Sequence, residues 1–85
     1  MQSVTLPEVR RYCKENDDPE TNALLEELAD SCEAYLLRQN IPLTAGNQPR
    51  FALCVKAMTL HELDHPGEPY SGGIREKIND LKFNH

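Results

Sequence analysis

The sequence predicts an all-α fold, a small bundle of about four helices that are short, long, long and apolar, and short. Apolar residues recur every three or four positions in four separate segments, which is the helical period. A capping residue or a first-turn proline precedes the first three segments. No segment alternates between apolar and polar residues as a half-buried strand does. The 85 residues have room for one core, so we expect a single helical domain over residues 1–85.

The first helix is expected from about Leu6 to Lys14. Thr5 and Glu8 have the spacing of a capping box, in which each side chain binds the backbone amide of the other. Pro7 is tolerated in a first turn, where its missing amide hydrogen has no partner inside the helix. The apolar face is predicted to contain Leu6, Val9, Tyr12 and Cys13. This leaves three cations for solvent or for a partner, namely Arg10, Arg11 and Lys14.

A long second helix is expected from Pro19 to about Gln39, with Asp18 as its N-cap. Pro42 should end it, because a proline disfavours helical backbone at the residue before it. The apolar stripe of this helix is predicted to contain Leu24, Leu25, Leu28, Cys32, Tyr35 and Leu36. Four acids are expected to lie away from that stripe, namely Glu26, Glu27, Asp30 and Glu33.

The third helix is expected to run to about Asp64, with Asn47 or Gln48 as its cap and Pro49 in its first turn. It is the most apolar segment, and a helix that is apolar on most sides lies either at the centre of a fold or at an interface. Ser71-Gly72-Gly73 then opens the last helix. The inward face of that helix is predicted to consist of Ile74, Ile78 and Leu81.

Composition and charge exclude several classes of protein. The chain is 39% hydrophobic and 27% charged, as a soluble domain is. No apolar run approaches the ~20 residues that cross a bilayer, and the first residues carry no signal pattern, so we expect no membrane partner and a cytoplasmic site of synthesis. The net charge is −5, with the excess of acids before residue 41 and no basic stripe after it. Tight sequence-specific DNA binding is therefore not expected.

The strongest catalytic pattern is His61-Glu62-Leu63-Asp64-His65, an H-E-x-x-H sequence in which two histidines would hold zinc and the glutamate would act as base. Pro66 should end the helix at the second histidine. A third ligand would have to come from His85 or from an acid such as Glu68 or Glu76. We therefore expect no metal, no cofactor and no enzymatic activity, and a zinc hydrolase stays a third hypothesis.

The cysteines give no sign of a disulfide framework or a zinc site. Cys13, Cys32 and Cys54 are odd in number, far apart and without a C-x-x-C pair. All three lie on expected apolar helical faces, where small buried thiols are common. The sequence predicts reduced cysteines that pack in the core.

The acids of the second helix have two interpretations. They are either a solvated face, or they pair with the cations of the first helix of a neighbouring copy in a head-to-tail ring. For the second interpretation, the predicted subunit contact joins Arg10, Arg11 and Lys14 on one copy to Glu26, Glu27, Asp30 and Glu33 on the next.

The order of these pieces resembles a known protein family. The resemblance rests on Thr5-Leu6-Pro7-Glu8-Val9-Arg10, on Asp17-Asp18 before the long helix, and on Ala23–Leu28 and Tyr35-Leu36 within it. The hydrophobic helix from Pro49 to His61 and the lead Pro69-Tyr70-Ser71-Gly72-Gly73-Ile74 complete it. Over about residues 4 to 83, the chain is similar to the small head-tail connector (adaptor) proteins of long-tailed bacteriophages.

That resemblance implies a structural virion protein rather than an enzyme. Such adaptors form a homo-oligomeric ring, expected here to be a dodecamer, between the portal protein and the tail-completion proteins. Genomic DNA would pass through the ring without sequence-specific binding, and an acidic wall would help it to slide. The expected location is the head-tail junction of the virion. The alternative is a small cytosolic helical protein-binding or regulatory module that uses its third helix as a groove for a partner helix.

Overall fold

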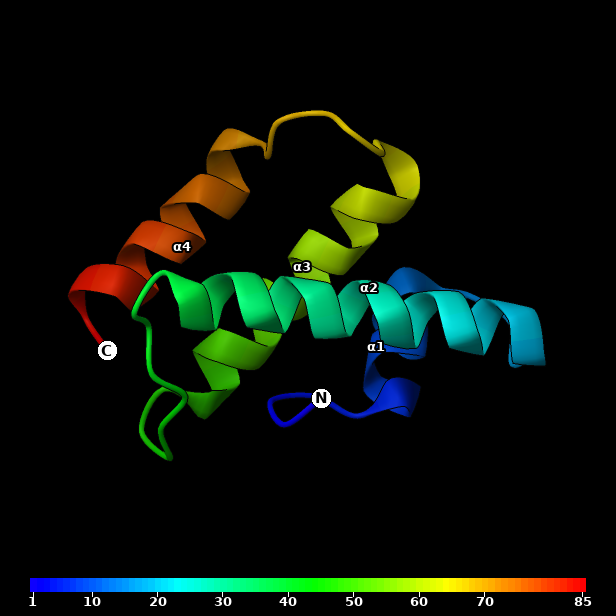
Figure 1. Cartoon of the computed structure of the whole chain (residues 1–85), viewed down its shortest axis with the longest axis horizontal. Helices are drawn as coiled ribbons and strands as arrows, with labels where there is room; N and C mark the ends of the chain where they lie inside the picture. Colours follow the sequence, from blue (N-terminus) through cyan, green and yellow to red (C-terminus); the bar gives the residue numbers. More distant parts are fainter.

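The computed structural model describes all residues from 1 to 85 and contains four helices and no strand (Figure 1). In chain order these are α1 (Leu6–Cys13), α2 (Pro19–Arg38), α3 (Gln48–Asp64) and α4 (Gly72–Phe83). The predicted all-α fold class, with helices that are short, long, long and short, is confirmed. Each predicted helix end lies within one or two residues of the observed one. None of the helices is both long and apolar enough to span a membrane.

The local start signals act as predicted at two of the first three helices. The Thr5 hydroxyl accepts a hydrogen bond from the Glu8 amide, and the Glu8 carboxylate accepts one from the Thr5 amide, which completes the capping box. Asp18 caps α2 by accepting a hydrogen bond from the Thr21 amide at 2.9 Å. Ser71 caps α4 in the same way, through the Ile74 amide.

Asn47 departs from the prediction. It occupies the N-cap position of α3, but its side chain caps no amide of the helix. Its side-chain oxygen Oδ1 instead accepts a hydrogen bond from the Thr44 backbone amide at 2.9 Å. Its side-chain nitrogen Nδ2 donates one to the Pro42 backbone carbonyl at 2.8 Å. The fully buried Asn47 therefore closes the loop between α2 and α3 rather than the helix end.

The apolar helix α3 is the centre of the bundle. It packs against α1, α2 and α4. Its buried residues lie around most of its circumference and are Phe51, Ala52, Cys54, Val55, Ala57, Met58 and Thr59. The one large apolar side chain of α3 that is exposed is Leu53, at 41%. Most of the apolar surface of α3 is thus covered by the other three helices, which leaves little of it for the partner helix that the alternative function expects.

The inward stripe of α2 is narrower than the sequence predicts. Leu25, Ala29, Cys32 and Leu36 are buried, whereas Leu24 is 45% exposed. The first turns of α2 project beyond the other helices at one end of the longest axis (Figure 1). Leu24 is exposed because it lies about 100° around the helix from Leu25, which faces the core and is fully buried. The predicted inward residues of α4 do face the core, with Ile74 and Leu81 buried and Ile78 partly buried.

Candidate functional site: charged surfaces and the groove between α2 and α4

The predicted basic contact residues of α1 are not equally free. The Arg10 guanidinium lies 3.3 Å from the Asn22 amide oxygen and 3.7 Å from an Asp17 carboxylate oxygen, so it is engaged within its own chain. Arg11 and Lys14 are exposed and make no side-chain hydrogen bond or ion pair. Two of the three predicted cations therefore remain available to a partner.

The four acids of α2 that were predicted to contact a neighbouring copy also differ in their exposure. Glu26, Glu27 and Asp30 are exposed, and the Asp30 carboxylate lies 2.9 Å from the N-terminal ammonium group of Met1. Glu33 is only 7% exposed, which corrects the expectation that it lies on the outer acidic face.

Glu33 binds the segment that precedes α1. Its carboxylate accepts hydrogen bonds from the amides of Gln2 and Ser3, at 2.8 to 3.0 Å, and from the Ser3 hydroxyl. Burial acts to raise the pKa of Glu33, but these hydrogen bonds outweigh it and hold the pKa below its ordinary value. Glu33 is therefore a structural residue, and it is not available for a contact between subunits.

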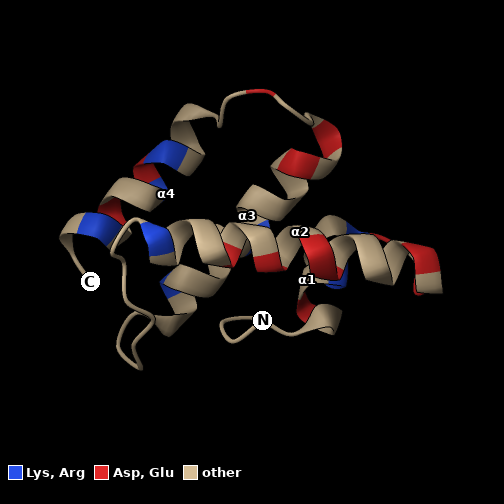
Figure 2. Ribbon diagram, viewed as in Figure 1, with Lys and Arg blue, Asp and Glu red and all other residues tan.

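Charge is unevenly distributed along the molecule (Figure 2), although the cations of α1 lie beside the acids at the start of α2. Acids gather on the segment before α2 and on the part of that helix up to Asp30, namely Glu15, Asp17, Asp18, Glu20, Glu26, Glu27 and Asp30. At the opposite end, α4 carries Arg75, Lys77 and Lys82, none of which forms an ion pair within the chain. Of the two acids on α4, Asp80 is held by Arg50 at 2.8 Å, which leaves only Glu76 to offset these cations. The sequence has equal numbers of acids and bases after residue 40. The excess of unpaired cations on α4 becomes visible only when the structure shows that Arg50 pairs with Asp80.

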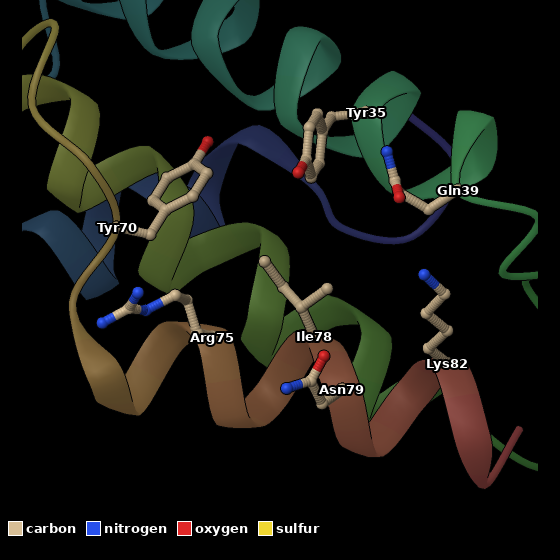
Figure 3. A pocket seen from close by; sticks show the side chains of 7 residues that line it. All are labelled: Tyr35, Gln39, Tyr70, Arg75, Ile78, Asn79 and Lys82. Atoms are coloured by element: carbon tan, nitrogen blue, oxygen red, sulfur yellow. The ribbon is translucent and has the colours of Figure 1, made fainter.

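A groove of about 260 Å³ lies between the second half of α2 and α4 (Figure 3). It exists because both helices pack on α3 rather than on each other. Its lining comes from α2, from the loop before α4 and from α4 itself, and consists of Tyr35, Gln39, Tyr70, Arg75, Ile78, Asn79 and Lys82. No carboxylate is among these residues. The groove therefore combines cations, hydrogen-bonding groups and a small apolar floor.

The two tyrosines form the inner wall of this groove. Their ring centroids are 6.2 Å apart in an edge-to-face arrangement. A second hollow of about 160 Å³ shares both rings and continues past Cys32, Arg38 and Glu62. Burial raises the pKa of the Tyr70 hydroxyl, and the neighbouring Cys32 and Glu62 act in the same direction. The Tyr70 phenol is therefore neutral at physiological pH.

The H-E-x-x-H residues hold a loop. Helix α3 ends at Asp64, and His65 already has non-helical backbone, as the proline after it predicts. His61 Nε2 lies 3.0 Å from the backbone carbonyl of Glu68, and His65 Nδ1 lies 3.0 Å from the carboxylate of the same residue. No three histidine, cysteine or acidic side chains are grouped as a metal site would require. Both histidines thus fasten the segment between α3 and α4.

The three cysteines are free and lie in the core, as predicted. Cys13, Cys32 and Cys54 are 7%, 3% and 0% exposed. Burial raises the pKa of each thiol to about 11. At physiological pH they are packing groups rather than nucleophiles.

Comparison with protein-family models, with curated proteins and with solved structures found no match.

Proposed function

We propose that this chain is a structural adaptor of the head-tail connector type, which assembles into a ring beneath a phage portal and joins capsid to tail. The resemblance along residues 4 to 83 suggests this function, and the helix order short, long, long, short is compatible with it. The ring would hold about a dozen copies by analogy with the family, and its partners would be the portal and tail-completion proteins.

One observation supports the proposal, the excess of acids around the start of α2 and the excess of unpaired cations on α4. A two-fold dimer centred on the acidic end would set carboxylates against carboxylates. A head-to-tail contact instead brings the acidic end of one copy to the basic end of the next, which electrostatic complementarity favours. Repeated with a fixed rotation, such a contact closes a ring.

The remaining acids have a role in the same assembly. Glu26 and Glu27 are exposed and form no ion pair within the chain. A ring surface that presents such carboxylates gives DNA phosphates few cations to bind. DNA would pass such a surface without being held, as the conduit between capsid and tail requires.

The test is the solution mass, measured by light scattering over a range of protein concentration, alone and with a portal from the same source. We expect either a large closed oligomer or a monomer that joins the portal stoichiometrically. The association should weaken as the salt concentration rises from about 50 mM to about 500 mM. The Debye length exceeds about 10 Å at the lower concentration and is well below about 10 Å at the higher one, so charges are screened over shorter distances. A small species that ignores every portal at every concentration would contradict the proposal and favour the protein-binding or regulatory module.

A further inference from the structure

We propose that the groove between α2 and α4 is the site that receives the acidic end of a second copy, formed by Glu15, Asp17 and Glu20. This inference rests on the proposed ring and names its contact. It replaces the cations of α1 with those of α4 as the basic partner.

The groove is built to hold carboxylates. Arg75 and Lys82 are seven residues apart on α4, which places them two turns and about 10 Å apart on one face of the helix. Neither forms an ion pair within the chain, and Ile78 lies between them (Figure 3). The amides of Gln39 and Asn79 add hydrogen-bond donors on the two sides. A segment with two free carboxylates and an apolar ring near one of them matches this lining.

The acidic end has that chemistry and is held in shape. Glu15 and Glu20 are exposed, and their side chains form no hydrogen bond or ion pair within the chain. Asn16, Asp17, Asp18 and Pro19 lie between them, and Pro19 restricts the backbone and offers an apolar ring. Asp17 is already bound by Asn22, and Asp18 by the Thr21 amide. A hydrogen bond of 3.2 Å from the Asp18 amide to the Asn16 carbonyl tightens the turn. A segment ordered before binding loses little conformational entropy when it docks.

The two surfaces cannot meet within one molecule. The acidic end lies at the start of α2 and the groove near the end of that helix, and its 20 residues span about 30 Å. The longest extent of the whole molecule is 37 Å, so the two surfaces lie near its opposite ends (Figure 2). Each surface is complete in one copy and needs the other surface from a neighbour. This is the geometry of a head-to-tail contact.

The cations of α1 form a poorer binding site for the acidic end than the groove does. Arg10 is already bound to Asn22 and lies near Asp17. Lys14 is followed directly by Glu15, so the acidic end of a neighbour would meet like charge there. The groove, by contrast, has no carboxylate in its lining. Charge complementarity therefore favours α4.

The test is an exchange of charge between the two surfaces. One variant carries Arg75→Glu and Lys82→Glu in the groove, and the other carries Glu15→Lys and Glu20→Lys at the acidic end. Each variant alone should need at least about tenfold more protein to assemble than the wild type, since like charges then meet at every contact. An equimolar mixture should recover assembly, because alternating copies place opposite charges together at both kinds of contact.

Arg11→Glu with Lys14→Glu is the matched control, since it changes the net charge as the groove variant does but on α1. It should assemble as the wild type does. Circular dichroism checks that each variant folds, which is expected because none of the six side chains makes a hydrogen bond or ion pair within the chain. Light scattering at low salt measures assembly, with portal added if the wild type assembles only on it.

Three outcomes would overturn the inference. They are a groove variant that assembles normally, a loss of assembly in the α1 control instead, and a mixture that stays unassembled. If the groove variant forms rings but no longer binds the portal, the groove serves the portal rather than a second copy. All of these leave the proposed ring intact. A wild type that forms no assembly, alone or with portal, would instead contradict the proposed function itself.

Discussion

Glu33 shows how one side chain on an acidic helix differs from its neighbours. Its carboxylate accepts hydrogen bonds from the backbone of Gln2 and Ser3 and from the Ser3 hydroxyl, while Glu26 and Glu27 on the same helix are exposed. Backbone donors that lose a buried partner cost free energy, since water does not replace it. Glu33 thus fastens the N-terminal segment to the middle of α2.

We therefore expect Glu33→Gln to lower the free energy of unfolding by about 1–3 kcal/mol at pH 7, because an amide offers one acceptor oxygen where the carboxylate offers two. The folded-state pKa of Glu33 lies below its ordinary value of 4.5, so the unfolded chain binds this proton first as the pH falls. The stabilisation is fully present above pH 4.5 and is lost as the pH falls through the folded-state pKa.

Urea unfolding at about pH 7 and at a series of pH values below 4.5 measures both effects. The wild type should lose more stability on acidification than Glu33→Gln does. Glu27→Gln removes an equal charge from an exposed position and should change stability by at most about 0.5 kcal/mol. Parallel pH profiles for wild type and Glu33→Gln would show that Glu33 is not ionised and bound as described.

The thiols give a second prediction at this scale. With a pKa of about 11, each cysteine has roughly one thiolate in a thousand at pH 8, and burial further blocks access to it. A disulfide reagent such as DTNB at pH 8 should therefore react slowly with the native protein and with all three cysteines at once in guanidinium. A cysteine that reacts within seconds in the native state would contradict the burial.

At the scale of the element, α3 decides the stability of the bundle because the other three helices all pack on it. Phe51 is fully buried, whereas Leu53, two residues on, is 41% exposed. The position of a residue on the circumference of α3, rather than its apolar character, therefore determines its contribution to the core.

Phe51→Ala should cost about 3–5 kcal/mol, and Leu53→Ala about 1 kcal/mol or less. If Phe51→Ala does not fold, Phe51→Leu provides a milder loss of volume at the same site. Denaturant unfolding with an unchanged m-value measures each difference. Equal costs at the two positions would mean that α3 buries a different face, for example against another copy.

What the sequence predicts and what it leaves open follow from the range of the interactions. Thr5, Asp18 and Pro66 act within three or four residues of themselves, so the helix ends were predictable. The hydrogen bond from the Ser3 amide to the Glu33 carboxylate joins residues 30 positions apart, and no local sequence pattern predicts it. The groove is less predictable still, because it depends on where α2 and α4 each dock on α3.

At the scale of the whole molecule, α4 is attached on one side only. It packs on α3 through Ile74 and Leu81, and the Arg50 guanidinium binds its Asp80 carboxylate and the Asn84 carbonyl, both at 2.8 Å. Towards α2 it borders the groove instead of a packed interface. An element with few buried contacts opens at a lower free energy than the core does. In the free protein, α4 is therefore expected to open locally while the other helices stay formed.

Native-state hydrogen exchange tests whether α4 opens before the other helices do. The amides of α4 should exchange faster than those in the middle of α2 and α3. Ile74→Ala should speed exchange in α4 by at least about tenfold and leave α2 unchanged, because a large buried side chain costs about 2 kcal/mol or more to truncate. Leu37→Ala, at a 44% exposed position on α2, is the control and should change neither. Uniform exchange in all four helices would instead identify one cooperative unit. In the assembled protein, α4 should become protected, since an occupied groove gives this helix the second side that it lacks alone.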